Sequence, residues 1–297
     1  MDKMFYNESS ALKLGWEPDW FGATEFDEVL VKKITQFQKS IGEKADGLCG
    51  PNTFRRIWTE RERDIEDYYP DEIRTTNGES FLLYCNDYVP IKWDKVVLPF
   101  NNGGMAFTKG YKKQFSKRKI DLGVTHWDVC LNAKSCFNVL NRRGLSIHFT
   151  IDNDGTIRQH LDMNHIALHA GASRWNNRSV GVEISNAYYE KYQPWYKKHV
   201  GEERPIMKGA KVHGQTLKPF TDFYPVQLDA LKALWEAVSE ACDIPLKSPT
   251  VTTTYRGASS GKYRGFIHHY HLTKGKIDCA GLDLNELFNK KEEDSCE

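Results

Sequence analysis

The sequence predicts an α/β protein, with a mixed β-sheet flanked by helices that follows a small N-terminal α-helical bundle. From about residue 120 onward, short runs rich in β-branched residues are interspersed with amphipathic segments, a pattern typical of an α/β domain. Before them, apolar residues recur at helical spacing around a glycine-containing turn. We therefore expect a helical domain over residues 1–65, a linker with a β-hairpin over 66–118 and the α/β domain over 119–297.

The expected N-terminal bundle has two helices. One apolar stripe with helical spacing predicts the first of them, and it consists of Leu30, Ile34, Phe37 and Ile41. A turn follows at Asp46-Gly47, and Asn52 is expected to cap the second helix. Phe54 and Ile57 are expected to face the first helix, so that the two helices enclose a small core.

The larger domain alternates between expected strands and helices. Strands are expected within residues 120–127, 146–152, 156–162, 179–185 and 264–273. Helices are expected within 127–144, 226–243 and 282–290, the first of them ending at Gly144. The stretch from Tyr188 to Tyr224 is aromatic, charged and irregular, which indicates an insertion. In the linker, residues 81–93 alternate apolar and turn residues, as in a short hairpin.

Composition narrows the classes of partner. The formal net charge is +1, so the chain lacks the overall excess of positive charge that is typical of proteins that bind nucleic acid or an anionic membrane. No apolar run approaches the roughly 20 residues of a membrane span, and the N-terminus lacks the apolar region of a signal peptide. We expect a monomer that is made in the cytoplasm. The seven cysteines are scattered without a CxxC pair, which favours free thiols.

Histidines and a carboxylate at strand ends predict a metal site. His126 ends one expected strand, and His268, His269 and His271 cluster at the end of another. Lys276, Asp278 and Cys279 follow in one loop. Zinc prefers imidazole, thiolate and carboxylate ligands, and a catalytic zinc site uses three of them. The pattern alone leaves open which histidine of the cluster binds, and whether Asp278 or Cys279 is the third ligand.

The order of these residues resembles the zinc-dependent N-acetylmuramoyl-L-alanine amidases, which include phage lysozyme-amidases, muropeptide amidases and animal peptidoglycan recognition proteins. The matching motifs are His126 at a strand end, HF-x-I-x-x-DG-x-I at 148–157, HAG at 169–171, S-V-G-V-E at 179–183, and His269 followed by Lys276 and Asp278. Many members carry a tyrosine just before the HF-type strand, where this sequence has Ile147. This departure fits members in which a glutamate acts as the base.

The resemblance implies roles for individual residues. Zinc is expected on His126, His269 and Asp278, with Glu183 as general base and Lys276 stabilising the oxyanion. His269 is favoured because an apolar strand precedes it, and Asp278 because it comes two residues after the lysine. The substrate is expected to contact His169, His165, Trp175 and Asn177.

A second resemblance concerns the N-terminus. Phe37, Gln38, Asp46, Gly47, Gly50 and Thr53 match a peptidoglycan-binding domain found beside wall hydrolases. Together, the two resemblances imply an endolysin-like enzyme that cleaves peptidoglycan between N-acetylmuramic acid and L-alanine, and reaches the wall after release from the cell. The alternatives are a non-catalytic recognition protein and an amidase that recycles soluble muropeptides. A metal nuclease is a weaker alternative, because the charge is near neutral.

Overall fold

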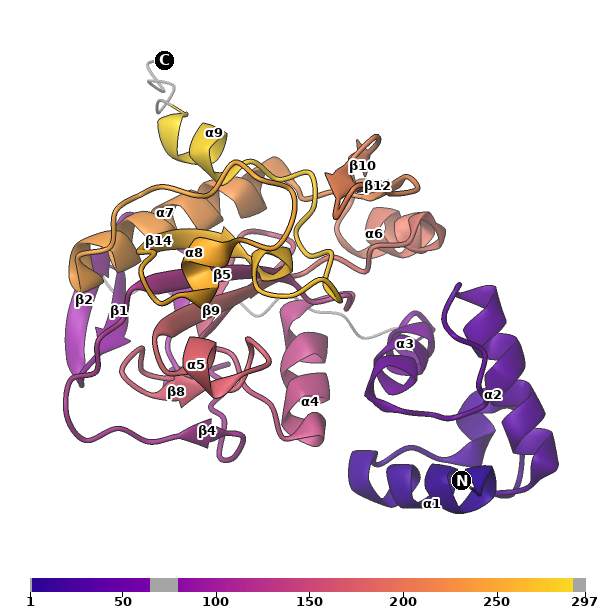
Figure 1. The fold of residues 1–297 in the computed structure, drawn as a ribbon. Helices are drawn as coiled ribbons and strands as arrows, with labels where there is room; N and C mark the ends of the chain where they lie inside the picture. The colour runs from indigo at the N-terminus through magenta and orange to yellow at the C-terminus, as the bar shows by residue number, and fades with distance from the viewer. Residues whose placement is uncertain (1, 65–79, 291–297) are drawn as a thin grey trace.

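The computed structural model describes residues 2–64 and 80–290. At its centre lies a six-stranded sheet in the order β14-β5-β9-β6-β7-β3 (Figure 1). Its strands are β3 (Val96–Val97), β5 (Leu122–Trp127), β6 (Phe149–Ile151), β7 (Ile157–Gln159), β9 (Ser179–Ile184) and β14 (Gly265–His268). Only the β6–β7 pair is antiparallel; the other four pairs are parallel. The predicted fold class, a mixed sheet flanked by helices, is confirmed.

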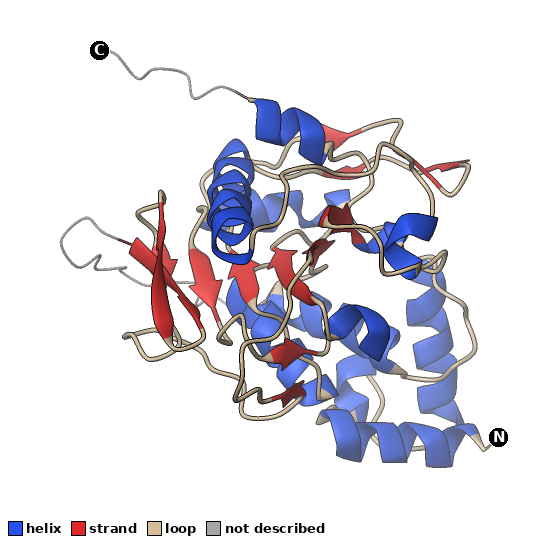
Figure 2. Cartoon of the chain, turned by 60° about the vertical axis from the view of Figure 1, so that its left-hand side comes forward, coloured by secondary structure: helices blue, strands red, loops and turns tan. Residues whose placement is uncertain are grey.

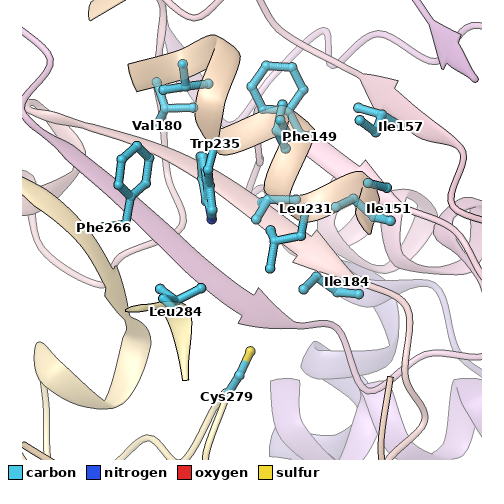
Figure 3. Close-up of a cluster of buried hydrophobic side chains, with 14 of the residues drawn as sticks. Phe149, Ile151, Ile157, Val180, Ile184, Leu231, Trp235, Phe266, Cys279 and Leu284 are labelled. Carbon is cyan, nitrogen blue, oxygen red and sulfur yellow. The ribbon is translucent and has the colours of Figure 1, made fainter. Parts of the chain in front are cut away.

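Successive side chains of the central strands point to opposite faces of the sheet, and one of these faces is apolar. In β9, Val180, Val182 and Ile184 are fully buried and belong to the main hydrophobic cluster. They share it with Leu231 and Trp235 of helix α7 (Pro225–Cys242), as Figure 3 shows. Because successive side chains of a strand point to opposite faces, the other residues of β9 point away from α7.

Helix α4 (Ala133–Arg143) lies on the other side of the sheet from α7 (Figure 1). Helices therefore cover both faces of the sheet (Figure 2). Gly144 ends it in the left-handed conformation, as predicted, with φ of 65°. A second hydrophobic cluster joins Val139 and Leu140 of this helix to Leu14, Leu30 and Phe54 of the N-terminal helices. The N-terminal bundle therefore packs on the same side of the sheet as α4.

The N-terminal bundle consists of α1 (Lys3–Leu14), the 3₁₀ turn η1 (Pro18–Phe21), α2 (Glu28–Ser40) and α3 (Pro51–Glu62). The predicted stripe lies on α2, where Leu30 and Ile34 are fully buried. The expected cap at Asn52 is wrong: Gly50 is the N-cap, because Pro51 occupies the first helical turn and carries no N–H to be capped. The predicted boundary between residues 65 and 66 lies outside the described residues.

Gln38 ties the loop between α2 and α3 together. Its side chain, 2% exposed, donates to Asp46 Oδ1 at 3.0 Å, to Leu48 O at 3.1 Å and to Thr53 Oγ1 at 3.1 Å. Its Oε1 accepts from Gly47 N at 2.8 Å. Gly47 has φ of +75°, and a Cβ there would lie 2.8 Å from the Val31 side chain. The FQ and DG motif residues thus have an internal structural role.

We expect Gln38→Ala to destabilise the protein by about 2–3 kcal/mol, because it leaves several buried polar groups without partners. Gln36 lies on the same helix and is exposed, so Gln36→Ala is the matched control and should change stability by less than about 0.5 kcal/mol. Chemical denaturation of both variants measures the difference. Equal stabilities would show that the Gln38 network contributes nothing.

The stretch expected to be a linker forms structure beside the sheet. The predicted hairpin is present as β1 (Ser80–Tyr84) and β2 (Asp87–Ile91), with full antiparallel register. Cys85 and Asn86 form its turn with positive φ, as a two-residue hairpin of the primed type requires. β3 follows as an edge strand of the central sheet, and β4 (Tyr111–Lys112) pairs with β8 (Ile166–Ala167).

The predicted insertion also folds onto the domain. It contains η2 (Glu190–Tyr192), α6 (Gln193–His199), β10 (Ile206–Met207), β11 (Lys211–Val212), β12 (Gln215–Thr216) and β13 (Phe220–Thr221). Arg204, 2% exposed, donates to the carbonyls of Ser185 and Asp222 at 2.6 and 2.9 Å and so anchors the insertion to the end of β9.

The remaining elements are short: α5 (Ser173–Asn176), α8 (Arg256–Ser259), η3 (His269–His271) and α9 (Leu284–Asn289). Within the described ranges, no helix has both the length and the apolar character that crossing a membrane requires.

Candidate active site

Two adjacent parallel strands place the first candidate residues side by side. His126 of β5 and Glu183 of β9 are direct partners in the register of the sheet. Both side chains point away from α7, because their neighbours Val182, Ile184 and Trp127 occupy the main cluster on that side. The alternation of the S-V-G-V-E motif therefore presents Glu183 to the same face as His126.

Three nitrogen and oxygen atoms converge next to Glu183. His126 Nδ1 lies 2.9 Å from His269 Nδ1 and 3.1 Å from Asp278 Oδ2, and the His269–Asp278 separation is 3.0 Å. All three residues are buried, with exposures of 2, 5 and 7%. They form a group of potential metal ligands in the described part of the chain.

The chemistry of this donor set fits zinc. Burial and the neighbouring His269 lower the pKa of His126 to about 4, so its imidazole is neutral at neutral pH and has a free electron pair. Burial opposes ionisation of Asp278, but His269 and His126 outweigh it and hold the pKa of this carboxyl well below its usual range. Three ligand atoms on a tetrahedral zinc ion lie roughly 3.3 Å apart, given bonds of about 2.0–2.1 Å. The observed triangle is close to that size.

The structure separates the two alternative histidines from this group. His271 Nδ1 accepts from His268 N at 3.1 Å, and its Nε2 donates to Val251 O at 2.8 Å, so both ring nitrogens are engaged. The ring of His268 stacks on that of Tyr270, a member of the main cluster. His269 is therefore the histidine of the cluster that reaches His126.

Cys279, the alternative third ligand, points into the hydrophobic core. It is fully buried in the main cluster, and Figure 3 shows its side chain on the side of Leu284 and Ile184. Tyr270 N donates to the carbonyl of Asp278 at 3.2 Å, which fixes the loop. This orientation directs the Asp278 carboxylate to the two histidines and the neighbouring thiol away from them.

Hydrogen bonds from His126 to His169 and from His169 to Ser179 fix the His126 ring. His126 Nε2 lies 3.0 Å from His169 Nδ1, and His169 Nε2 lies 3.1 Å from Ser179 Oγ. If His126 Nδ1 binds a metal, its Nε2 carries the proton and donates to His169. Partners of this kind fix the tautomer and the orientation of a ligand histidine.

Gly181 of β9 makes room for His169. A Cβ at this position would lie 2.6 Å from both Cε1 and Nδ1 of His169, and 2.6 Å from Ile147 Cδ1. Real Cβ atoms do not approach so closely, so the glycine of the S-V-G-V-E motif is required for the contact between His169 and His126.

We expect Gly181→Ala to weaken zinc binding about 10- to 100-fold, the usual loss when the support of a ligand histidine is disturbed. The added methyl group would displace His169 from His126. A competition titration against a chromophoric chelator measures the affinity, and circular dichroism checks that the variant is folded. Unchanged affinity in a folded variant would show that His169 does not support the site.

Glu183 and Lys276 line the same cavity as the three candidate ligands. Burial raises the pKa of Glu183 to about 8, while Arg55 and Lys276 act in the opposite direction. Its Oε2 is buried and has no hydrogen-bond partner among the described residues. Positive charge nearby, including a metal cation, favours the ionised form that can accept a proton.

The insertion holds the loop that carries Lys276. His213 follows β11, and its Nε2 donates to the carbonyl oxygen of Lys276 at 2.9 Å. His213 itself is fixed because its N–H donates to Thr252 O at 2.8 Å. The insertion thus positions one wall of the cavity, which its irregular sequence does not indicate.

Comparison with known proteins identifies the chain. The profile of the N-acetylmuramoyl-L-alanine amidase family Amidase_2 matches residues 116–279, more than half of the 297 residues. The chain belongs to this family. A putative N-acetylmuramoyl-L-alanine amidase of Rickettsia conorii, RC0497, is 36% identical over 70 residues, which cover 21% of the chain and 26% of that protein. The match thus spans about a quarter of the curated relative's length.

Solved amidase structures resemble the chain more distantly. The Escherichia coli amidase AmiD, in complex with anhydro-N-acetylmuramic acid-L-Ala-D-γ-Glu-L-Lys, is 20% identical over 46% of the chain and 49% of its own, with a TM-score of 0.32. LysC from Clostridium intestinale is 16% identical over 61% and 87%, with a TM-score of 0.37. The Ph2119 endolysin of a Thermus scotoductus bacteriophage is 14% identical over 66% and 99%, also at 0.37. We infer nothing further from likeness of this degree.

The residues expected to contact substrate lie in different places in the structure. His169 lines the cavity of the candidate ligands. His165 lines a separate cavity beside the β1–β2 hairpin, where its ring stacks on Tyr111. Trp175 is 6% exposed and packs in a hydrophobic cluster with Leu122. Asn177 is exposed at the end of α5 and accepts from Arg118 through its carbonyl. The structure therefore brings only His169 to the candidate metal ligands.

Sequence reasoning missed the arginines of the cavity. Arg55 and Arg56 of α3 and Arg143 of α4 line it together with the candidate ligands. The family motifs contain none of them, and arginines on helices are usually solvated. The order of motifs along the sequence does not predict how the N-terminal bundle packs, so it could not indicate that these three arginines line one cavity.

Proposed function

We propose that the chain is a zinc-dependent amidase that hydrolyses the amide bond between N-acetylmuramic acid and L-alanine in peptidoglycan. The observation that carries the proposal is the convergence of His126, His269 and Asp278 next to Glu183 and Lys276 in one cavity. Family membership supports the choice of bond, because the family is named for it.

His126 Nδ1, His269 Nδ1 and Asp278 Oδ2 are the atoms that would hold the metal. A bound zinc ion supplies Lewis-acid chemistry: it acidifies water and polarises a carbonyl group. Glu183 takes the proton from the attacking water at its unpartnered Oε2 and later delivers it to the nitrogen of L-alanine. Lys276 offers positive charge to the oxyanion that develops on the lactyl carbonyl. The C–N bond breaks, which leaves a lactyl carboxylate and a free amine.

We further propose that the N-terminal bundle binds the wall and that the protein acts as an endolysin after release from the cytoplasm. The support is the FQ…DG…G…T motif, which the sequence shares with wall-binding modules. Attachment to an insoluble polymer raises the local concentration of the attached active site. The experiment compares intact sacculi with soluble muropeptides as substrates, with and without a chelator, and identifies the products by mass.

Release of stem peptides from sacculi, lost with chelator and restored by zinc, is the expected result. Cleavage restricted to soluble muropeptides would indicate an amidase that recycles muropeptides. Binding to sacculi without release of any peptide would indicate a recognition protein.

A further inference from the structure

The N-terminal bundle forms one wall of the candidate active-site cavity. Glu43, Asn52, Arg55 and Arg56 line it from the bundle, and Arg143 lines it from the last turn of α4. The candidate ligands, Glu183 and Lys276 line the same cavity. Side chains of the bundle therefore line the cavity that a substrate has to enter.

Specific contacts hold α3 in this place. Thr59 Oγ1, on a side chain that is 1% exposed, donates to Val129 O at 3.1 Å. One turn later, Glu62 accepts a hydrogen bond from Ser135 of α4. Arg55, Thr59 and Glu62 have the spacing i, i+4 and i+7, so they share one face of the helix. Since Thr59 and Glu62 bind the amidase domain, Arg55 faces it as well.

Of the three arginines that line the cavity, Arg55 and Arg143 have guanidinium groups with no hydrogen-bonded partner among the described residues. Arg56 pairs with Glu43 at 3.6 Å, but the Arg55 guanidinium makes no hydrogen bond or ion pair within residues 2–64 and 80–290. Arg143 Nε and Nη1 are buried without a hydrogen-bond partner there. Burial and the charge of Arg55 lower the pKa of Arg143 to about 10. Both side chains are half-buried, and buried guanidinium nitrogens without partners are costly, so the pair indicates a place where an anion can bind.

A role in stability alone explains these residues poorly. Arg143 ends α4, where a cation stabilises the helix dipole, but an exposed side chain would do this without losing hydration. Arg55 lies in the middle of α3, where no such benefit arises. Arg55 and Arg143 repel each other, and the charge of Glu183 offsets part of this repulsion; a bound anion between the two guanidinium groups would offset more of it.

We infer that Arg55 and Arg143 bind the free α-carboxylate of a γ-linked D-glutamate in the stem peptide, so that the N-terminal bundle completes the substrate site. The inference rests on the proposed function. In the ligand of the Escherichia coli amidase AmiD a D-γ-Glu follows L-Ala, and a γ-linkage leaves the α-carboxylate of that residue free. Guanidinium groups bind carboxylates through paired, charge-assisted hydrogen bonds, and the two arginines line the same cavity as the candidate ligands.

The test compares two soluble substrates that differ in one group. Both are N-acetylmuramoyl-L-Ala-D-γ-Glu-L-Lys with the lysine carboxyl amidated; in one the glutamate α-carboxyl is free, and in the other it is a carboxamide. The full chain should favour the carboxylate in kcat/KM by about tenfold to a hundredfold. Arg55→Met and Arg143→Met should each lose most of this preference. Because Arg55 also acts on the pKa of Glu183, the readout is the ratio of kcat/KM between the two substrates, which a change at Glu183 leaves unaltered.

Arg61→Met is the matched control. Arg61 is on the same helix, but it is exposed and stacks on Trp20 instead of lining the cavity. It should keep the full preference. An equal fall in kcat/KM for both substrates, with the preference kept, would show that the arginine has a structural role. Faster cleavage by Arg55→Met would show that the bundle obstructs the site. Either result overturns the inference.

Binding of both peptides to the Glu183→Gln variant, measured by calorimetry, separates this inference from the proposed function. Equal affinities would overturn the carboxylate site even if the chain is an amidase. Preferential binding of the carboxylate that disappears in Arg55→Met would uphold the site even if no cleavage is found.

Discussion

On the proposed mechanism, Asp278→Ala should abolish zinc binding and lower kcat/KM by at least about a thousandfold. Removing the carboxylate leaves two imidazoles, whose Nδ1 atoms lie 2.9 Å apart, and a site with two ligands instead of the three that catalytic zinc requires. Metal analysis of the purified variant and its rate of peptide release from peptidoglycan measure the two effects. Both should be seen in a protein that is still folded.

Cys279→Ala is the matched control for this change. Its thiol lies in the main hydrophobic cluster, with Leu284 and Ile184, so the substitution should cost some stability and leave the metal content unchanged. The opposite pattern, with zinc lost from Cys279→Ala and kept by Asp278→Ala, would reverse the assignment of the third ligand.

Glu183→Gln should lower kcat by about 10²- to 10⁴-fold, the usual contribution of a general acid–base residue. The carboxamide has the same shape but cannot take a proton from water. Glu183 lines the cavity, and its Oε2 has no hydrogen-bond partner among the described residues. Steady-state kinetics on a soluble muropeptide measure the loss, and metal analysis verifies that zinc is retained.

Asp128→Asn is the control for the loss of a buried carboxylate. Burial raises the pKa of Asp128 to about 7, and its Oδ1 accepts from the backbone of Cys130 and Asn186. It does not line the cavity, so its replacement should affect stability much more than kcat. An equally large fall in kcat in Glu183→Gln and Asp128→Asn would indicate a general effect of replacing a buried carboxylate by an amide. Full activity of Glu183→Gln would show that Glu183 is not the general base.

The sequence predicts those parts of the molecule whose pattern is local. Alternation in residues 179–184 predicts β9 and places Glu183 opposite Val182 and Ile184, because a strand has only two faces. The choice of His269 is harder to predict, since β14 ends at His268 and a 3₁₀ turn then redirects the next three side chains. That choice depends on which ring nitrogens are engaged elsewhere, which requires the structure.

Contacts between distant segments could not be predicted from local patterns. Arg55 and Arg143 are 88 positions apart, and they line one cavity only because Thr59 and Glu62 fix α3 against the amidase domain. Trp175 shows the converse. Its place between two motifs indicates a substrate loop, but the short helix α5 turns its ring into a hydrophobic cluster, where a large aromatic ring gains more from burial.

Hydrolysis in ¹⁸O-labelled water tests the central claim most directly. The substrate is an N-acetylmuramoyl tripeptide, and the position of the label in the products is read by mass spectrometry. We expect one ¹⁸O atom in the lactyl carboxylate of muramic acid, none in the peptide, and a free amine on L-alanine. Label in a carboxylate within the peptide, with none in the lactyl carboxylate, would mean that a different bond is cut and would contradict the account.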